Sequence, residues 1–174
     1  MIDTTKLYTI SVYSDNSPGV LQRVSTSFTK RKINIESLTV SETSEEGLSL
    51  FTIMAHVPSD HIDTVVKQIE RVIEVRKVYA SLDDDLVFRE AALVRVELKK
   101  DSSLQEIEEI IERESAGIVY VDEESAVIQT YGTEDDTQVV YKLLIPFGVM
   151  QFVRTGRIAL RKSFISVHDH EKVK

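Results

Sequence analysis

The sequence predicts an α+β protein made of two tandem ferredoxin-like βαββαβ domains. The spacing of apolar residues alternates between strand and helix periods in the order β-α-β-β-α-β, and that order occurs twice. An acidic run, Asp83-Asp84-Asp85, interrupts the apolar pattern between the two copies. With 174 residues and 42% hydrophobic residues, the chain can form two small domains, which we expect over 1–82 and 87–174.

The first domain is expected to begin with a strand over 7–13, where apolar and polar residues alternate. Turn-forming residues occupy 14–19, and apolar side chains at helical spacing then predict a helix from Val20 to near Arg31. Two strands over 33–43 and 48–57 flank a hairpin turn at 45–47. A second helix, capped by Ser59 or Asp60, precedes a last strand over 75–82.

The second domain repeats this order. A strand over 92–98 leads into a helix capped by Ser102 or Ser103, and a hairpin follows with strands over 117–121 and 126–132. The second helix, over 134–144, is ended by Pro146, and a final strand spans 149–153.

Each sheet is expected to have helices on one face and a partly uncovered second face. The third strand of the first domain carries apolar residues on both faces, with Leu50 and Met54 opposite Phe51 and Ile53. This pattern predicts that the second face, or the strand edge, meets another subunit. Small domains bury little of their surface, so oligomerisation is expected from size as well.

Composition limits the function classes. The net charge of −8 and the pI of about 5.1 argue against nucleic acid as a partner, because an acidic surface repels phosphate. The absence of cysteine excludes disulfides, thiolate metal sites and cysteine nucleophiles. No apolar stretch approaches the length of a membrane span, and the N-terminus does not resemble a signal peptide, so we expect a cytoplasmic protein without membrane contact.

The last twenty-one residues are basic, with a local net charge of +4 from Arg154 onward. They form either a solvated tail, which is the more common case, or an arm that docks on a partner. Within them, His168-Asp169-His170 has a spacing that could bind a metal, but it more often marks a polar chain end, and we expect no metal site. We also expect no catalytic residues, because the sequence has no nucleophile elbow and no evident acid–base pair.

One connection has the composition of a binding loop. Asp15-Asn16-Ser17-Pro18-Gly19 joins the first strand to the first helix, whose unpaired N-terminal amides can hold a carboxylate. Glycine permits close approach to the backbone, and the Asn16 amide can bond both carboxylate and amino groups. Alternatively, these residues only form a turn. The corresponding connection of the second domain, 99–103, lacks Pro-Gly, which suggests that the site belongs to the first domain.

Four segments carry a resemblance to a known family. Asp15–Val24, followed by Asn34-Ile35-Glu36-Ser37-Leu38-Thr39-Val40, resembles the ACT domain of the acetohydroxyacid (acetolactate) synthase small subunits. The segments 89–96 and 153–156 are similar to that family's interdomain strand and to its C-terminal Arg-Ser/Thr-Gly element. One departure is that the family commonly has Arg-Gly-Tyr/Phe-Asn-Ile where this chain has Arg31-Lys32-Ile33-Asn34-Ile35.

The resemblance implies a regulatory subunit in branched-chain amino acid biosynthesis. It implies a catalytic large subunit as partner, a transferase carrying thiamine diphosphate, Mg and FAD, with no cofactor in this chain. It also implies a homodimer through the ACT domain, and feedback inhibition by valine or another branched-chain amino acid. Carried over residue by residue, the effector site consists of Asn16, Gly19, Val20 and Leu21 from the loop, and Asn34 and Ile35 from the second strand.

Other functions remain to be weighed. A stand-alone ACT-domain sensor controlling a different enzyme or a transcription factor would share the same loop. Acylphosphatases have a similar fold but need an arginine in the first connection, and residues 14–19 contain none. An RNA-binding module of this topology would need aromatic residues on its central strands and a basic face, and the acidic composition argues against it.

Overall fold

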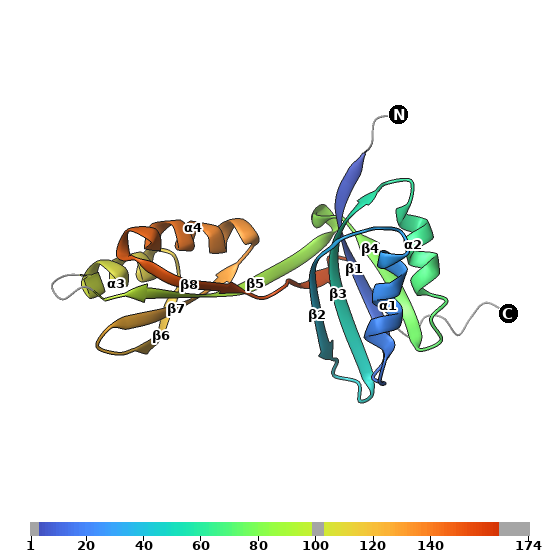
Figure 1. Ribbon diagram of the computed structural model, residues 1–174, viewed down its shortest axis with the longest axis horizontal. Coiled ribbons are helices and arrows are strands. Elements are labelled where there is room, and N and C mark those ends of the chain that lie inside the picture. The colour runs from blue at the N-terminus through green and yellow to red at the C-terminus, as the bar shows by residue number, and fades with distance from the viewer. Residues whose placement is uncertain (1–3, 99–102, 164–174) are drawn as a thin grey trace. The chain divides into compact units, whose positions relative to one another are not determined.

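The computed structural model describes residues 4–98 and 103–163, and they fold as two compact units (Figure 1). Unit 1 runs to Val87 and also contains the chain from Ile158, whereas unit 2 is Phe88–Arg157. The sequence instead predicts a second domain over 87–174. The difference arises from a short strand near the C-terminus, described below, which belongs to unit 1.

Unit 1 contains four antiparallel strands and two helices. Along the chain they are β1 (Thr5–Asp15), α1 (Val20–Thr29), β2 (Ile35–Glu42), β3 (Leu48–Pro58), α2 (Ile62–Ile69) and β4 (Val75–Ser81). The strand order in the sheet is β2-β3-β1-β4, with both helices on one face (Figure 1). The two central strands are therefore β3 and β1, and β2 is an edge strand.

Unit 2 repeats this plan. A short 3-10 turn, η1 (Asp83–Asp85), precedes β5 (Leu86–Glu97), α3 (Ser103–Arg113), β6 (Gly117–Val121), β7 (Ser125–Gly132), α4 (Glu134–Leu144), η2 (Ile145–Phe147) and β8 (Val149–Arg154). The strand order β6-β7-β5-β8 is the same as in unit 1, element for element. The predicted α+β class with two βαββαβ repeats is thus confirmed.

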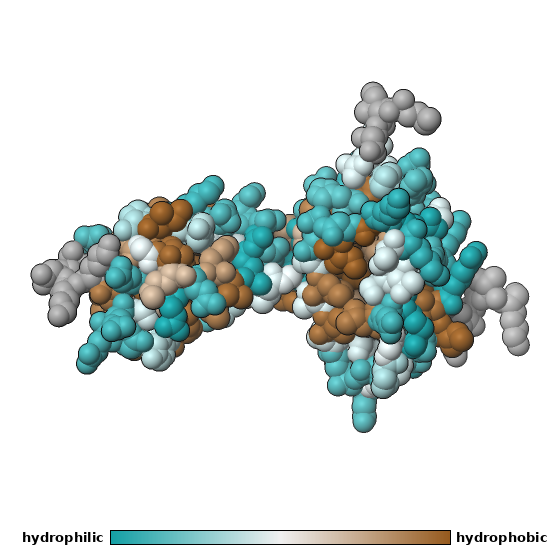
Figure 2. Space-filling model, viewed as in Figure 1, coloured by the Kyte–Doolittle hydropathy of each residue, from teal (hydrophilic) through white to brown (hydrophobic). Residues whose placement is uncertain are grey.

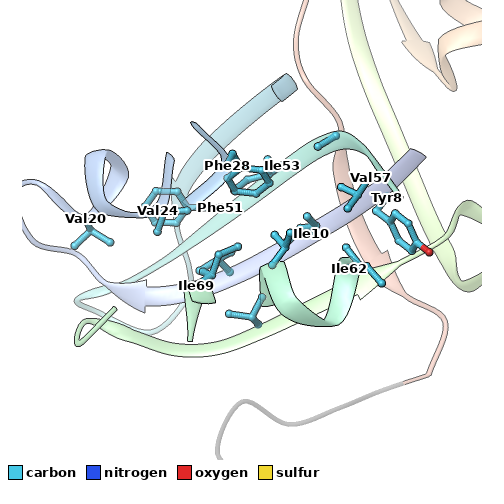
Figure 3. Packing of buried hydrophobic residues seen from close by; sticks show 14 residues of the cluster. Tyr8, Ile10, Val20, Val24, Phe28, Phe51, Ile53, Val57, Ile62 and Ile69 are labelled. Atoms are coloured by element: carbon cyan, nitrogen blue, oxygen red, sulfur yellow. The ribbon is translucent and has the colours of Figure 1, made fainter. Parts of the chain in front are cut away.

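The core of unit 1 lies between the sheet and its two helices (Figure 3). Val24 and Phe28 of α1 and Ile69 of α2 lie at helical spacing on the buried sides of their helices and face the alternate residues Ile10 and Val12 of β1. All five side chains are essentially inaccessible to water. Burial of each such side chain stabilises the fold by roughly 1.5–3 kcal/mol, so these contacts hold both helices against the sheet.

Some expected helix ends differ from the structure. α2 begins after His61, and neither Ser59 nor Asp60 caps it. The Ser59 hydroxyl instead donates to the Thr4 carbonyl at 2.7 Å, across 55 residues of sequence. Of the two caps proposed for α3, Ser102 lies outside the described residues, and Ser103 is the first residue of the helix.

Of the two alternatives that the sequence left open for the basic C-terminal segment, a solvated tail does not describe residues 154–163, which are folded against the rest of the chain. Arg157 is only 2% exposed, and its guanidinium lies 3.9 Å from the centre of the Phe88 ring. Arg154 pairs with Glu134 at 2.7 Å. A strand, β9 (Ile158–Arg161), follows, and the Lys162 amide donates to the Asp85 carbonyl at 2.9 Å. The candidate metal-binding sequence His168-Asp169-His170 lies outside the described residues.

The second face of the unit 1 sheet is more covered than the sequence predicts. Met54 is 5% exposed and its neighbour Thr52 is also buried, while Leu50 is half-buried. Residues of β9 lie against this face, beside Ser11 and Tyr79. By contrast, within residues 4–98 and 103–163 no strand pairs with the outer edge of β2. Apolar patches lie over the β2 and β3 region in Figure 2.

Candidate functional site

The predicted binding loop is the connection between β1 and α1 (Figure 1). Its last residue, Gly19, occupies the N-cap position with φ +84° and ψ −5°, a left-handed conformation that L-residues adopt only at a cost. A Cβ at this position would also lie 3.0 Å from Nη1 of Arg23. The glycine is therefore required by the backbone path into the helix.

The start of α1 lacks a side-chain cap. No side chain within the described part of the chain accepts a hydrogen bond from its first turn, and no acidic residue lies there. The first amides of a helix have no intrahelical acceptor and carry a partial positive charge. The Val20 amide donates to the Ser17 carbonyl at 3.5 Å, so the amides left for an anion are those that follow it. Because Asn16 and Gly19 are both exposed, an anion from solvent can reach this helix start.

The predicted loop residues differ in accessibility. Leu21 is 45% exposed and can contact a ligand with its side chain. Val20 is only 1% exposed, because its side chain belongs to the core cluster, so it can contribute only through its backbone. The side chains that line this site are thus those of Asn16 and Leu21, with the backbone around Gly19 between them.

Contacts that the sequence analysis missed hold the loop in place. The backbone N–H of Asp15 donates to the Glu74 carbonyl, and that of Asn16 donates to the Gly47 carbonyl, each at 2.8 Å. Two ion pairs add to these bonds: Arg23 with Glu74 at 2.5 Å, and Arg76 with Asp15 at 2.7 Å. Exposed pairs of this kind contribute about 0.2–1 kcal/mol each. No local pattern indicates them, because the partners lie 51 and 61 residues apart.

The two predicted residues of the second strand lie far from this loop within one chain. Asp15, at the loop end of β1, pairs with Leu48 of β3, whereas Ile35, at the start of β2, pairs with Ala55. Ala55 lies seven residue steps beyond Leu48 along β3. At about 3.3 Å per step, the distance between the two ends is roughly 23 Å. The structure therefore brings together Asn16, Gly19, Val20 and Leu21, and it places Asn34 and Ile35 at the opposite end of the sheet.

The family glycine that this chain replaces with Lys32 corresponds to a special backbone conformation. Lys32 follows the end of α1 and has φ +57°, one of two positive values at non-glycine residues among the described positions. Its N–H donates to the Thr29 carbonyl at 3.0 Å, which closes the helix end. The helix thus ends in the left-handed conformation even though this position holds lysine instead of glycine, the residue that adopts that conformation most easily.

Other kinds of site were sought over the same residues. No helix in the described ranges is long and apolar enough to cross a membrane. No three His, Cys, Asp or Glu side chains among residues 4–98 and 103–163 are grouped so that they could hold a metal ion.

Comparison with family models covers both units. Residues 10–77 match the model described as the AHAS small subunit-like ACT domain. Residues 89–163 match the model described as the small subunit of acetolactate synthase.

Comparison with individual proteins gives the same result over nearly the full chain. The acetolactate synthase small subunit of Bacillus subtilis is 36% identical over 148 residues, which are 84% of this chain and 86% of that protein. A probable acetolactate synthase small subunit of Archaeoglobus fulgidus is also 36% identical, over 88% of this chain and 95% of that protein. The crystal structure of the acetolactate synthase small subunit from Thermotoga maritima superposes with a TM-score of 0.82 at 31% identity, covering 92% of this chain and 99% of that one.

Proposed function

The chain belongs to the family of acetolactate synthase small subunits, and we propose that its ACT domain binds valine or another branched-chain amino acid and thereby inhibits a catalytic large subunit. The observation that supports this proposal is the uncapped, solvent-accessible helix start at Gly19, in a sheet whose β2 edge has no strand partner among residues 4–98 and 103–163.

The open β2 edge explains how the two halves of the site could meet. An edge strand has unpaired N–H and C=O groups and pairs readily with another strand. In a symmetric dimer the two β2 strands would run antiparallel, so the start of the partner's strand would lie beside the end of this one. That end, near Glu42, is the end of the sheet that carries the β1–α1 loop, because both pair with the start of β3. Dimerisation would thus place a second copy of Asn34 and Ile35 at the loop.

The chemistry of the loop suits a zwitterion with an apolar side chain. The amides at the start of α1 would hold the carboxylate, and the side-chain oxygen of Asn16 could accept from the ammonium group. Leu21 offers an exposed apolar surface for the effector side chain. From the other protomer, Asn34 would add a second amide; in this chain its Nδ2 already donates to Glu36 at 3.2 Å, which leaves its oxygen for the ligand.

The catalytic chemistry belongs, in this proposal, to the large subunit. Thiamine diphosphate, Mg and FAD would bind there, and this chain would supply no catalytic residue. Its contribution would be regulatory: an effector that binds one arrangement of the dimer better than another shifts the equilibrium of the whole assembly.

Calorimetry with valine on the full-length chain tests the effector site. We expect saturable binding by the wild type and none by Gly19→Asp, because the new carboxylate would occupy the position of the ligand's carboxylate. Gly148→Asp is the matched control, since Gly148 also has a positive φ, belongs to unit 2, and the substitution adds the same charge. Equal binding by the wild type and Gly19→Asp would exclude this site.

The partner is tested by affinity purification of the chain with the catalytic acetolactate synthase subunit. Co-purification, together with valine-dependent inhibition of the mixture, is the expected result. A chain that binds valine but not this subunit would instead support a stand-alone ACT-domain sensor.

A further inference from the structure

A small cavity of about 110 Å³ lies on the second face of the unit 1 sheet, away from the two helices. Its floor comes from β1 and β4, where Ser11 and Tyr79 are directly opposite each other in the sheet register. Its roof comes from Ala159, Leu160 and Arg161 of β9 and from Ser163, two residues after the strand. A cavity of this size holds a few water molecules or one small ion.

Two buried polar atoms at this cavity lack hydrogen bonds. The Tyr79 hydroxyl and Arg161 Nε are inaccessible to solvent, and neither has a partner among the residues that the structure describes. Leaving a buried polar group unpaired destabilises the fold, and more so when the group is charged. Both atoms can donate a hydrogen bond, so a ligand that accepts from both would remove this cost.

Two cations lie beside the Tyr79 ring, and one of them, Arg161, lines the cavity. The Arg161 guanidinium lies 5.2 Å from the centre of the Tyr79 ring, and Lys77 Nζ lies 5.3 Å from the same ring. The lining contains Arg161 but no carboxylate. This arrangement attracts an anion and lacks an acceptor for the ammonium group of an amino acid.

Tyr13 adds a further hydroxyl to the lining. Its ring contacts Tyr79 edge to face, with the ring centres 6.3 Å apart. Burial, and then the neighbouring Tyr79, raise the pKa of Tyr13 above its ordinary value, so its hydroxyl keeps its proton and can donate. Hydrogen-bond donors from β1, β4 and the segment around β9 therefore share the lining with the apolar side chains of Ala159 and Leu160.

We propose that this cavity binds a small tetrahedral oxyanion of the size of inorganic phosphate, held by Arg161, Tyr79 and the neighbouring hydroxyls. The bound anion connects β9, which is among the last segments of the chain, to the sheet of the ACT domain. The site lies on the opposite face of the sheet from the helices and is independent of the effector site proposed above, so either can fail without the other.

Nuclear magnetic resonance of the full-length chain with ¹³C-labelled tyrosine tests the proposal, because two of the six tyrosines line the cavity. Inorganic phosphate is added at constant ionic strength with chloride as the balancing anion. We expect the Tyr13 and Tyr79 signals to shift saturably, with half-saturation at about 1 mM, which a ligand of five heavy atoms can reach. Sulfate should compete, and chloride alone should cause no saturable shift.

Three variants identify the ligand contacts. Tyr79→Phe removes one hydroxyl but keeps the ring under Arg161, and we expect it to weaken phosphate binding several-fold. Arg161→Ala should weaken it at least tenfold, whereas Arg31→Ala, an exposed arginine outside the cavity, should bind like the wild type.

Two results would overturn the proposal. One is the absence of saturation with phosphate beyond the effect of chloride, which would mean that only water occupies the cavity. The other is unchanged phosphate binding by Tyr79→Phe. This variant keeps the aromatic ring that Arg161 contacts, so it remains informative even if Arg161→Ala displaces β9.

Discussion

Replacing Gly19 with alanine separates backbone strain from side-chain contact at the loop. At φ +84°, an L-residue loses roughly 1–2 kcal/mol relative to its relaxed conformation. Alanine also restricts the unfolded chain, which offsets roughly 0.5 kcal/mol of that cost. The new Cβ would lie 3.0 Å from Arg23 Nη1, but this atom ends a flexible, 44% exposed side chain and can move away at little cost. We therefore expect Gly19→Ala to lower the free energy of unfolding by about 1 kcal/mol.

The assay is equilibrium urea unfolding of four proteins: wild type, Gly19→Ala, Arg23→Ala and the double variant. The double-mutant cycle measures how much of the Gly19→Ala effect depends on Arg23, and we expect a coupling below about 0.5 kcal/mol. Gly19→Asn should cost less than Gly19→Ala, because asparagine tolerates the left-handed region and can cap a helix. The reasoning is refuted if alanine is neutral, or if removing Arg23 abolishes its effect.

Two further substitutions test how glycine, or its absence, affects stability at two other backbone positions. Lys32→Gly should raise the free energy of unfolding by about 0.5 kcal/mol, because glycine relieves the positive φ of Lys32 at the end of α1 but makes the unfolded chain more flexible. Urea unfolding measures this change, and an unchanged or lower free energy would contradict it. Gly132→Ala should destabilise unit 2 by about 2–4 kcal/mol, because the added Cβ would overlap the Cβ of Asp136, whose side chain forms the capping box of α4 with Thr133. Thermal unfolding measures this effect, and a loss no larger than that of Gly19→Ala would show that α4 shifts freely.

The element order could be predicted from the sequence because each unit follows local periodicity. The helix over 134–144 has the same bounds in the structure, and the strand over 117–121 does as well. Both are flanked by residues with clear signals, such as Thr133 before α4 and Pro146 after it. The loop at Gly19 was predictable for the same reason, because the requirement for glycine is a property of one backbone position.

Features that depend on distant pairing could not be predicted. Whether Arg157 is a surface or a buried residue depends on its packing against Phe88, 69 positions earlier in the chain, and no sequence period reports this. The ion pairs of Arg23 and Arg76 with residues beside the loop are of the same kind. The separation of Asn34 from the loop follows only from the strand register. In each case the decisive partner is selected by the fold and not by neighbouring residues.

The position of β9 has a consequence for how the protein is made. Unit 1 consists of the first half of the sequence plus a segment that begins at Ile158, so the ribosome must synthesise all of unit 2 before unit 1 can be completed. Domains tend to fold as they emerge from the ribosome. One face of the ACT-domain sheet would therefore stay less covered, until β9 has been synthesised, than it is in the complete fold. A truncation that removes the chain from Ile158 onward would therefore leave unit 1 incomplete, although most of unit 1 lies far earlier in the sequence.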